Sequence, residues 1–219
     1  MKVLTFLPSV SLKIYIFAAE MEQQQPINTN WSENIIIADA NYVDNVAFDL
    51  IVNFERIIER RIPPADLAQW VECVAMDGGM RPNEEQQTHV VLVYDKEKPT
   101  MENFNPSDLV GQIDAQAFKG PLGEFSFSAI NAERLASKED LLTDTIRLIA
   151  SQEGVKRIMI IPDEESDYDH VRQLLRRADP DKHITLFAMQ PMPGGNFRQE
   201  ILGYSLMAAL GIKGEELGI

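Results

Sequence analysis

The segment Asn34–Ile58, NIIIADANYVDNVAFDLIVNFERII, changes its hydrophobic pattern within a few residues. Its first five residues, NIIIA, form a short apolar run rich in β-branched side chains, which predicts a strand buried on both faces. Apolar residues then recur at helical spacing with charged residues between them, which predicts an amphipathic helix directly after the strand. A buried strand followed at once by a helix is typical of the first half of a βαβ unit.

The same alternation continues along the rest of the chain. Four further apolar segments have the length of strands, namely His89–Tyr94, Phe125–Ile130, Arg157–Ile161 and Ile184–Met189. Helical patterns lie between and after them, namely a helix that Ser107 can cap and that carries Leu109, Ile113 and Phe118, then Leu141–Ala150, Tyr168–Ala178 and the apolar Phe197–Leu210. We therefore expect a three-layer αβα fold with a mostly parallel five-stranded sheet and helices on both faces.

Length and composition predict how the chain is organised. With 219 residues and 45% hydrophobic content, residues 31–219 can form a single α/β domain. Residues 1–30 are expected to form a flexible N-terminal extension. Alternatively, the start codon is assigned too far upstream and Met21 is the natural start. A signal or anchor is the alternative, but Pro8 and Lys13 interrupt this apolar stretch, which is too short to span a bilayer.

Charge and cysteine content restrict the partners. The net charge of −14 disfavours RNA as a partner, because phosphate backbones repel an acidic surface unless a basic patch or a metal ion intervenes. The lone cysteine, Cys73, excludes an intramolecular disulfide and fits a reducing cytoplasm. We expect a cytoplasmic protein without a membrane segment.

Acidic residues follow several predicted strands. Asp39, Asp95 and Asp163 stand at strand ends, which share one edge of a parallel sheet, and the fourth strand runs into PDEESDYD. Clustered carboxylates repel one another unless a cation joins them, and oxygen ligands suit Mg²⁺ or Mn²⁺. A competing interpretation is that Asp140 and Asp169 belong to capping boxes opened by serines three residues earlier, and only start helices.

Three of these elements together resemble the PIN-like superfamily and, within it, the NYN-type nucleases. The first is IIIADAN, with Asp39 and Asn41; the second is LLTDTIRLIA, with Asp144; the third is Glu165-Ser166-Asp167-Tyr168, which lies over an Asp-x-Asp-Phe pattern. Their order matches across residues 34–190. The turn after the fourth strand is about two residues longer than in the family pattern, so either Asp163 or Glu165 takes the ligand role there.

The resemblance implies a metal-dependent endoribonuclease in which Mg²⁺ or Mn²⁺ activates water. Its catalytic residues would be Asp39, Asp144 and Asp167, and its metal ligands the same three with Asp163 and Glu165. Asn41, Arg172 and Arg176 are candidate substrate-binding residues, the arginines because they follow the acidic turn at helical spacing. The alternative is a catalytically degenerate PIN-like protein that serves as a binding module or as a homodimer through its apolar C-terminal helix.

Two other resemblances are weaker or carry no activity. Asp39-Ala-Asn41 and Asp163-x-x-x-Asp167 are similar to motifs of haloacid-dehalogenase-like phosphohydrolases, although Asn41 replaces the second acid of the first motif. The chain from Met21 to Ile219 also resembles an uncharacterised family of Bacteroidales proteins, most clearly at NWSENIIIADANYVDNVAFDLIVNFER. That second likeness implies no activity.

Overall fold

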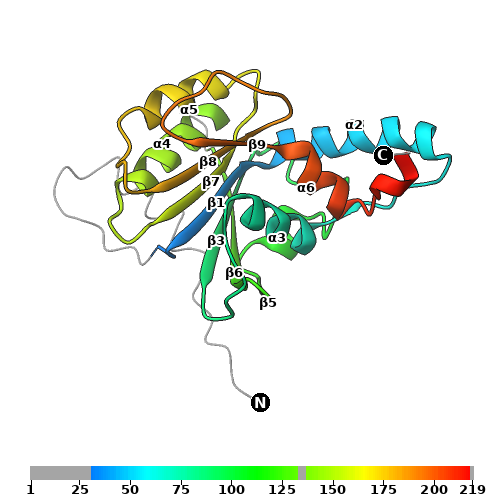
Figure 1. Ribbon diagram of the computed structural model, residues 1–219, viewed down its shortest axis with the longest axis horizontal. Coiled ribbons are helices and arrows are strands. Elements are labelled where there is room, and N and C mark those ends of the chain that lie inside the picture. The colour runs from blue at the N-terminus through cyan, green and yellow to red at the C-terminus, as the bar shows by residue number, and fades with distance from the viewer. Residues whose placement is uncertain (1–30, 133–136, 218–219) are drawn as a thin grey trace, which may run out of the picture.

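A seven-stranded sheet forms the centre of the protein (Figure 1). The computed structural model describes residues 31–132 and 137–217. The strands of this sheet are β1 (Asn34–Asp39), β3 (Gln87–Tyr94), β5 (Ala117–Gly120), β6 (Gly123–Asn131), β7 (Arg157–Ile161), β8 (His183–Ala188) and β9 (Arg198–Ile201). Neighbouring strands run parallel, except that β5 is antiparallel to β6.

Helices and two short segments complete the described fold. The α-helices are α2 (Ala40–Ile58), α3 (Leu67–Asp77), α4 (Lys138–Ser151), α5 (Tyr168–Leu175) and α6 (Leu202–Ala209). A two-residue parallel pair joins β2 (Ala65–Asp66) and β4 (Phe104–Asn105), and two short helical turns are η1 (Leu109–Ile113) and η2 (Gly214–Leu217).

The strand order places a reversal at the middle of the sheet. Along the sheet the order is β5-β6-β3-β1-β7-β8-β9, so the chain adds β3 and β6 on one side of β1 before it crosses over and adds β7, β8 and β9 on the other. The direction of growth changes between β1 and β7. In open parallel sheets, ligands bind outside the carboxyl ends of the strands at such a switch point.

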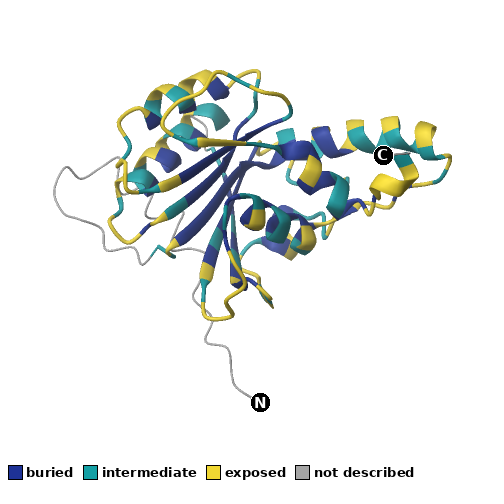
Figure 2. Cartoon of the chain, viewed as in Figure 1, coloured by how far each residue is buried: buried dark blue, intermediate teal, exposed yellow. Residues whose placement is uncertain are grey.

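Strand β1 separates two hydrophobic cores. Ile36 and Ala38 belong to the core beneath α2, α3 and α6, whereas Ile35 and Ile37 belong to the core beneath α4 and α5. All four side chains are fully buried, and Figure 2 shows the buried strands running between exposed helix surfaces. The predicted α/β fold, with a mostly parallel sheet and helices on both faces, is therefore confirmed.

The five predicted strands are present, but the sheet also contains β5 and β9. The predicted helix carrying Leu109, Ile113 and Phe118 is wrong beyond its first turn. That turn, η1, is capped by Asp108 rather than by Ser107, because the Asp108 carboxylate accepts hydrogen bonds from the backbone N–H groups of Val110 and Gly111. The chain then enters β5, where Phe118 stacks on Phe125 of β6 with ring centroids 4.9 Å apart. Pairing along the edge of the sheet outweighs a short helical pattern.

The predicted C-terminal helix Phe197–Leu210 is also too long. Residues Arg198–Ile201 form β9 on the open edge of β8, and only Leu202–Ala209 are α-helical. Leu202, Leu206 and Ala209 of α6 are buried in the core, whereas Tyr204 is 71% exposed. This packing accounts for the apolar character of the helix within one chain, and the homodimer stays a prediction.

The sequence predicts an N-terminal extension and the absence of a membrane segment. The N-terminal extension, residues 1–30, lies outside the described residues. Within residues 31–132 and 137–217, none of the helices has the length and apolar content needed to cross a membrane.

His89 of β3 is expected to make the stability of the protein depend on pH. Its Nδ1 lies 3.0 Å from Ser126 Oγ, its ring packs edge-on against Trp31, and burial lowers its pKa from 6.5 to about 4. The unfolded chain takes up a proton near pH 6.5 while the folded chain resists it, so the free energy of unfolding should fall by about 2–3 kcal/mol as the pH drops from about 6.5 to 4.

Urea denaturation at a series of pH values measures this decline. The variant His89→Gln should show a smaller decline over the same range, because it removes the titrating group. The matched control is His183→Gln, at an exposed position on β8, which should retain the decline of the wild type. An unchanged decline in His89→Gln would contradict the assignment.

Candidate functional site

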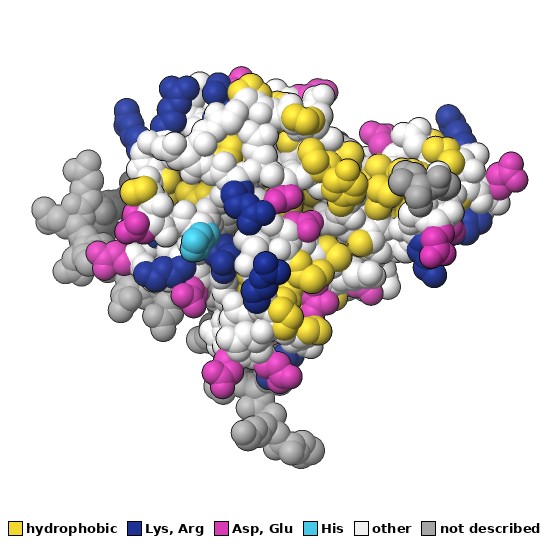
Figure 3. Space-filling model, in the orientation of Figure 1, with side chains coloured by type: hydrophobic (Ala, Val, Ile, Leu, Met, Phe, Trp, Pro, Cys, Tyr) yellow, Lys and Arg dark blue, Asp and Glu magenta, His cyan; other side chains and the backbone are white. Residues whose placement is uncertain are grey.

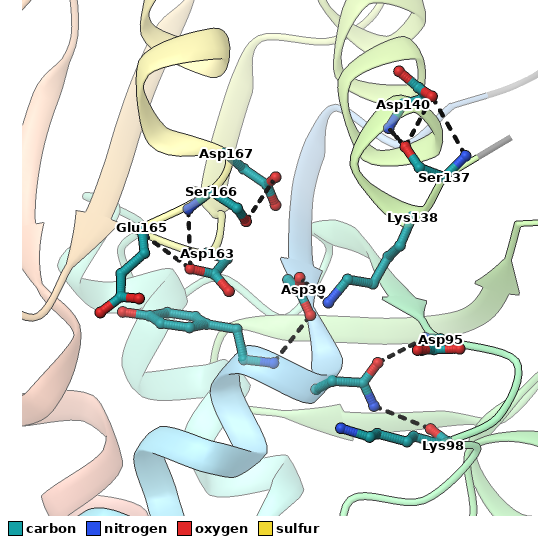
Figure 4. Close-up of polar contacts among 12 residues, drawn as sticks. Asp39, Asp95, Lys98, Ser137, Lys138, Asp140, Asp163, Glu165, Ser166 and Asp167 are labelled. Atoms are coloured by element: carbon teal, nitrogen blue, oxygen red, sulfur yellow. Dashed lines mark hydrogen bonds and ion pairs between the residues drawn. The ribbon is translucent and has the colours of Figure 1, made fainter.

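Charged side chains meet at the switch point, at the carboxyl ends of β1 and β7. Figure 4 shows them facing one another from three elements: Asp39 from the end of β1, Lys138 from the start of α4, and Asp163 and Asp167 from the turn between β7 and α5. The sequence predicted that the three aspartates would lie together at this edge, and the structure brings them together there.

Asp39 is completely buried and joins two layers of the fold. Its Oδ1 accepts a hydrogen bond of 3.0 Å from the backbone N–H of Tyr42, so the side chain caps the N-terminus of α2. Its Oδ2 lies 2.5 Å from the Nζ atom of Lys138, the first residue of α4. A buried carboxylate requires compensating positive charge, and Lys138 supplies it.

Asp167 is the second buried carboxylate, with 1% of its surface exposed. Its Oδ1 accepts a hydrogen bond of 3.0 Å from Ser166 Oγ, whereas its Oδ2 is buried without a hydrogen-bond partner among the described residues. Burial raises the pKa of Asp167, and the negative charges of Asp39, Glu139 and Asp163 raise it further, against the lowering effect of the Ser166 hydroxyl. The side chain thus has one oxygen oriented by Ser166 and one without a partner.

The acidic turn after β7 is fixed by its own side chains. The Oδ1 atom of Asp163 accepts hydrogen bonds from the backbone N–H groups of Glu165 at 2.9 Å and Ser166 at 3.4 Å. Glu164 Oε2 accepts from the backbone N–H of Met189, which anchors the turn to the end of β8. Glu165 is exposed. Of the two alternative ligand residues, Asp163 therefore points toward the site and Glu165 lies at its rim (Figure 4).

Tyr42 places a phenol beside this turn. Its hydroxyl oxygen is buried and has no hydrogen-bond partner among the described residues. Burial, together with the negative charges of Glu164, Asp163 and Glu165, raises the pKa of Tyr42 far above its ordinary value of 10. The phenol therefore keeps its proton, and it is available as a donor toward the acidic turn.

Asn41, a candidate substrate-binding residue, is engaged in structural contacts. Its Nδ2 donates to the backbone carbonyl of Lys98 at 3.0 Å, and its Oδ1 accepts from the backbone N–H of Asp95 at 2.6 Å. The side chain is 8% exposed. It thus fastens the segment that follows β3 to the start of α2, and both polar atoms are used.

Asp144, proposed from the sequence as a catalytic residue, lies elsewhere. It stands six residues after Lys138 on α4, about 9 Å along the helix axis. Its side chain is 63% exposed and pairs with Arg147. It lines an open groove of about 950 Å³ between α4 and α5, together with Asp140 and Arg176. The structure therefore separates Asp144 from Asp39 and Asp167.

The two arginines proposed for substrate binding also lie on α5 and beyond, away from Asp39. Arg172 pairs with Asp169 at 3.1 Å, while Arg176 caps the end of α5 and lines the groove beside Asp144. Among residues 31–132 and 137–217, no group of three or more His, Cys, Asp or Glu side chains is arranged to hold a metal ion. The predicted site residues are therefore divided between the switch point, where Asp39, Asp163 and Asp167 lie, and the groove between α4 and α5, where Asp144 and Arg176 lie.

Lys138 is the site residue that sequence reasoning missed. The predicted cap at Ser137 is confirmed, because Ser137 and Asp140 form a complete capping box. A lysine directly after a helix N-cap is electrostatically unfavourable, because the helix dipole is positive there. A lysine at that position therefore indicates a compensating anion nearby, which the structure identifies as Asp39.

Comparison with known proteins places the chain in a family. Residues 28–217 match a family described as "Family of unknown function (DUF6621)". The chain belongs to that family. Neither the curated proteins nor the solved structures gave a match. The family description names no activity. The geometry at the switch point is therefore the basis for the function of this DUF6621 protein.

Removing the charge of Lys138 should destabilise the fold strongly. The variant Lys138→Met leaves the Asp39 carboxylate buried without its cation, which should lower the free energy of unfolding by about 2–4 kcal/mol at pH 7 in urea denaturation. Arg147→Met removes an equally paired cation from an exposed position on the same helix and should cost less than about 1 kcal/mol. Equal losses in the two variants would contradict the role of Lys138. The double variant Asp39→Asn/Lys138→Met should recover part of the loss.

Asn41 should affect stability more than its size suggests. Asn41→Ala removes two part-buried hydrogen bonds to the backbone of Asp95 and Lys98, for a loss of about 2 kcal/mol in the free energy of unfolding. The control is Asn53→Ala at an exposed position on the same helix, with an expected change within about 0.5 kcal/mol. Stability unchanged by Asn41→Ala would contradict the structural role of these two hydrogen bonds.

Proposed function

We propose that this chain is a PIN-like protein that does not hydrolyse phosphodiesters and acts as a binding module at its switch point. Support for the PIN-like relationship comes from the order of the motifs around Asp39, Asp144 and Asp167, on a parallel sheet in which β6, β3, β1, β7 and β8 follow one another. The absence of hydrolytic activity is inferred from the contact of 2.5 Å between Lys138 Nζ and Asp39 Oδ2.

An ammonium at that distance occupies the place of a metal ion. Mg²⁺ binds carboxylate oxygens at about 2.1 Å and keeps an octahedral shell of oxygen ligands. A metal on Asp39 Oδ2 would have to displace the Lys138 ammonium, which already neutralises the carboxylate. The covalently attached cation thus performs the charge compensation for which clustered carboxylates otherwise recruit a divalent ion.

The other acidic residues do not complete a metal site either. Asp167 directs Oδ1 to Ser166, and Asp163 directs Oδ1 to the backbone of its own turn. Asp144 points into the groove beside α5. Although Asp167 Oδ2 has no hydrogen-bond partner, no three His, Cys, Asp or Glu side chains among the described residues are arranged to hold a metal ion, so this arrangement does not fit Mg²⁺ or Mn²⁺.

An active ribonuclease is the first alternative, and it requires Asp39 to be released from Lys138. The haloacid-dehalogenase-like alternative requires a proton-transferring acid two residues after Asp39. Asn41 stands at that position with both amide atoms bound to the segment after β3. Binding of Mn²⁺ and cleavage of RNA, measured on the same variants, distinguish the proposed non-hydrolytic protein from a ribonuclease.

The melting temperature in the presence of Mn²⁺ tests the proposal. The wild type should shift by less than about 1 °C in millimolar MnCl₂, because Lys138 occupies the carboxylate. Lys138→Met frees Asp39 for the ion and should gain about 2–5 °C, since an ion that binds only the folded state stabilises it. The double variant Asp39→Asn/Lys138→Met is the control and should lose that gain.

The same proteins are assayed for cleavage of a labelled single-stranded RNA with Mn²⁺. The wild type should leave the RNA intact. A wild-type Mn²⁺ shift that Asp39→Asn abolishes, accompanied by RNA cleavage, would overturn the proposal in favour of the nuclease. A shift that survives Asp39→Asn would indicate adventitious binding elsewhere on the acidic surface.

A further inference from the structure

A hollow of about 400 Å³ opens at the sheet edge opposite Asp39, at the amino-terminal ends of β7, β8 and β9. Its walls come from the end of α3 and from the first residues of the three strands, and they include Gly78, Gly79, Arg157, Lys182–Thr185 and Asn196–Arg198. This volume lies within the range of small-molecule binding sites.

The lining of the hollow is cationic on an otherwise acidic protein. Arg157, Lys182 and Arg198 line it with His183, and no Asp or Glu among the described residues does. Acidic residues outnumber Lys and Arg by 34 to 20 in the whole chain, so this composition departs from that of the chain. Figure 3 shows Lys, Arg and His side chains near the middle of the face on which α3 lies, with Asp and Glu side chains beside them. An anionic ligand fits such a lining.

Arg157 is held rigidly with one nitrogen to spare. Its Nε donates to the backbone carbonyl of Gly78 at 3.1 Å, and its Nη1 donates to Asn34 Oδ1 at 3.0 Å. Its Nη2 makes no hydrogen bond to the described residues. Burial lowers the pKa of Arg157, Glu33 opposes that effect, and the positive charge of Arg198 adds to it. The two guanidinium groups therefore repel each other across the hollow.

Arg198 and Lys182 supply the remaining charge. Arg198 donates from Nη2 to Glu200 Oε1 at 2.6 Å, and its Nη1 lies close to the backbone of Gly79. The Nζ atom of Lys182 donates to the carbonyls of Gln152 and Val155, both at 2.6 Å, which fixes its ammonium at the edge. Lys182 thus contributes charge from a fixed position, while Arg198, 62% exposed and paired with Glu200, would reach a ligand by turning away from that carboxylate.

We propose that this hollow binds the phosphate group of a small phosphate monoester between Arg157 and Arg198. The planar guanidinium presents paired N–H donors that match phosphate oxygens, and an anion between two of them removes their mutual repulsion. Phe197 is a further lining residue of the same hollow, and the organic part of the monoester would pack against it. The site is separate from the switch point, so it does not depend on the function proposed there.

Isothermal titration calorimetry with inorganic phosphate and with phenyl phosphate, at constant ionic strength, tests the site on the full-length chain. Both probes should bind the wild type saturably, with phenyl phosphate the tighter of the two because of Phe197. Arg198→Ala should weaken both about tenfold, the effect of losing one charge-assisted contact. Its side chain is largely exposed, so the fold tolerates the substitution.

Arg147→Ala is the matched control, since it removes one exposed arginine on a helix of the other face. It should leave both affinities within about twofold of the wild type. The absence of saturable binding, or equal weakening by Arg147→Ala and Arg198→Ala, would overturn the site. Binding of inorganic phosphate without phenyl phosphate would overturn its assignment to a monoester.

Discussion

The burial of β1 on both faces is the constraint on which the rest of the structure depends. Ile35, Ile36 and Ile37 have no exposed surface, because helices cover the sheet above and below. A strand enclosed in this way ends inside the protein, and its last residue, Asp39, is therefore buried as well. A buried carboxylate has to be satisfied by donors and by a cation, and this requirement fixes the start of α2 and the position of Lys138.

The two edges of the sheet have opposite electrostatic character for a common reason. Helices that connect parallel strands run back against them, so their N-termini lie at the carboxyl edge and their C-termini at the amino edge. The positive ends of the helix dipoles favour carboxylates at the first edge, where Asp39 caps α2. At the second edge Arg157 and Lys182 donate to carbonyls that follow α3 and α4. An acidic and a basic site thus arise at opposite edges of one fold.

Local patterns predict the buried strands and longest helices well because their signals are strong. The run NIIIA and the helical spacing after it correspond to β1 and α2. Short edge elements are predicted poorly, since the partner strand rather than their own residues selects their conformation. Arg198–Ile201 lies within the segment that the sequence predicts as a C-terminal helix, yet it becomes β9 because β8 offers unpaired backbone groups.

The sequence by itself determined that this is an α/β chain with a parallel sheet and with Asp39, Asp163 and Asp167 at one edge, because hydrophobic periodicity and strand ends are local properties. Only the tertiary structure decided which charged groups meet. Asp144 and Lys138 belong to the same helix, yet one faces a groove beside α5 and the other reaches Asp39. The rotation and depth of α4 against the sheet make that difference, and they are set by packing between segments far apart in the chain.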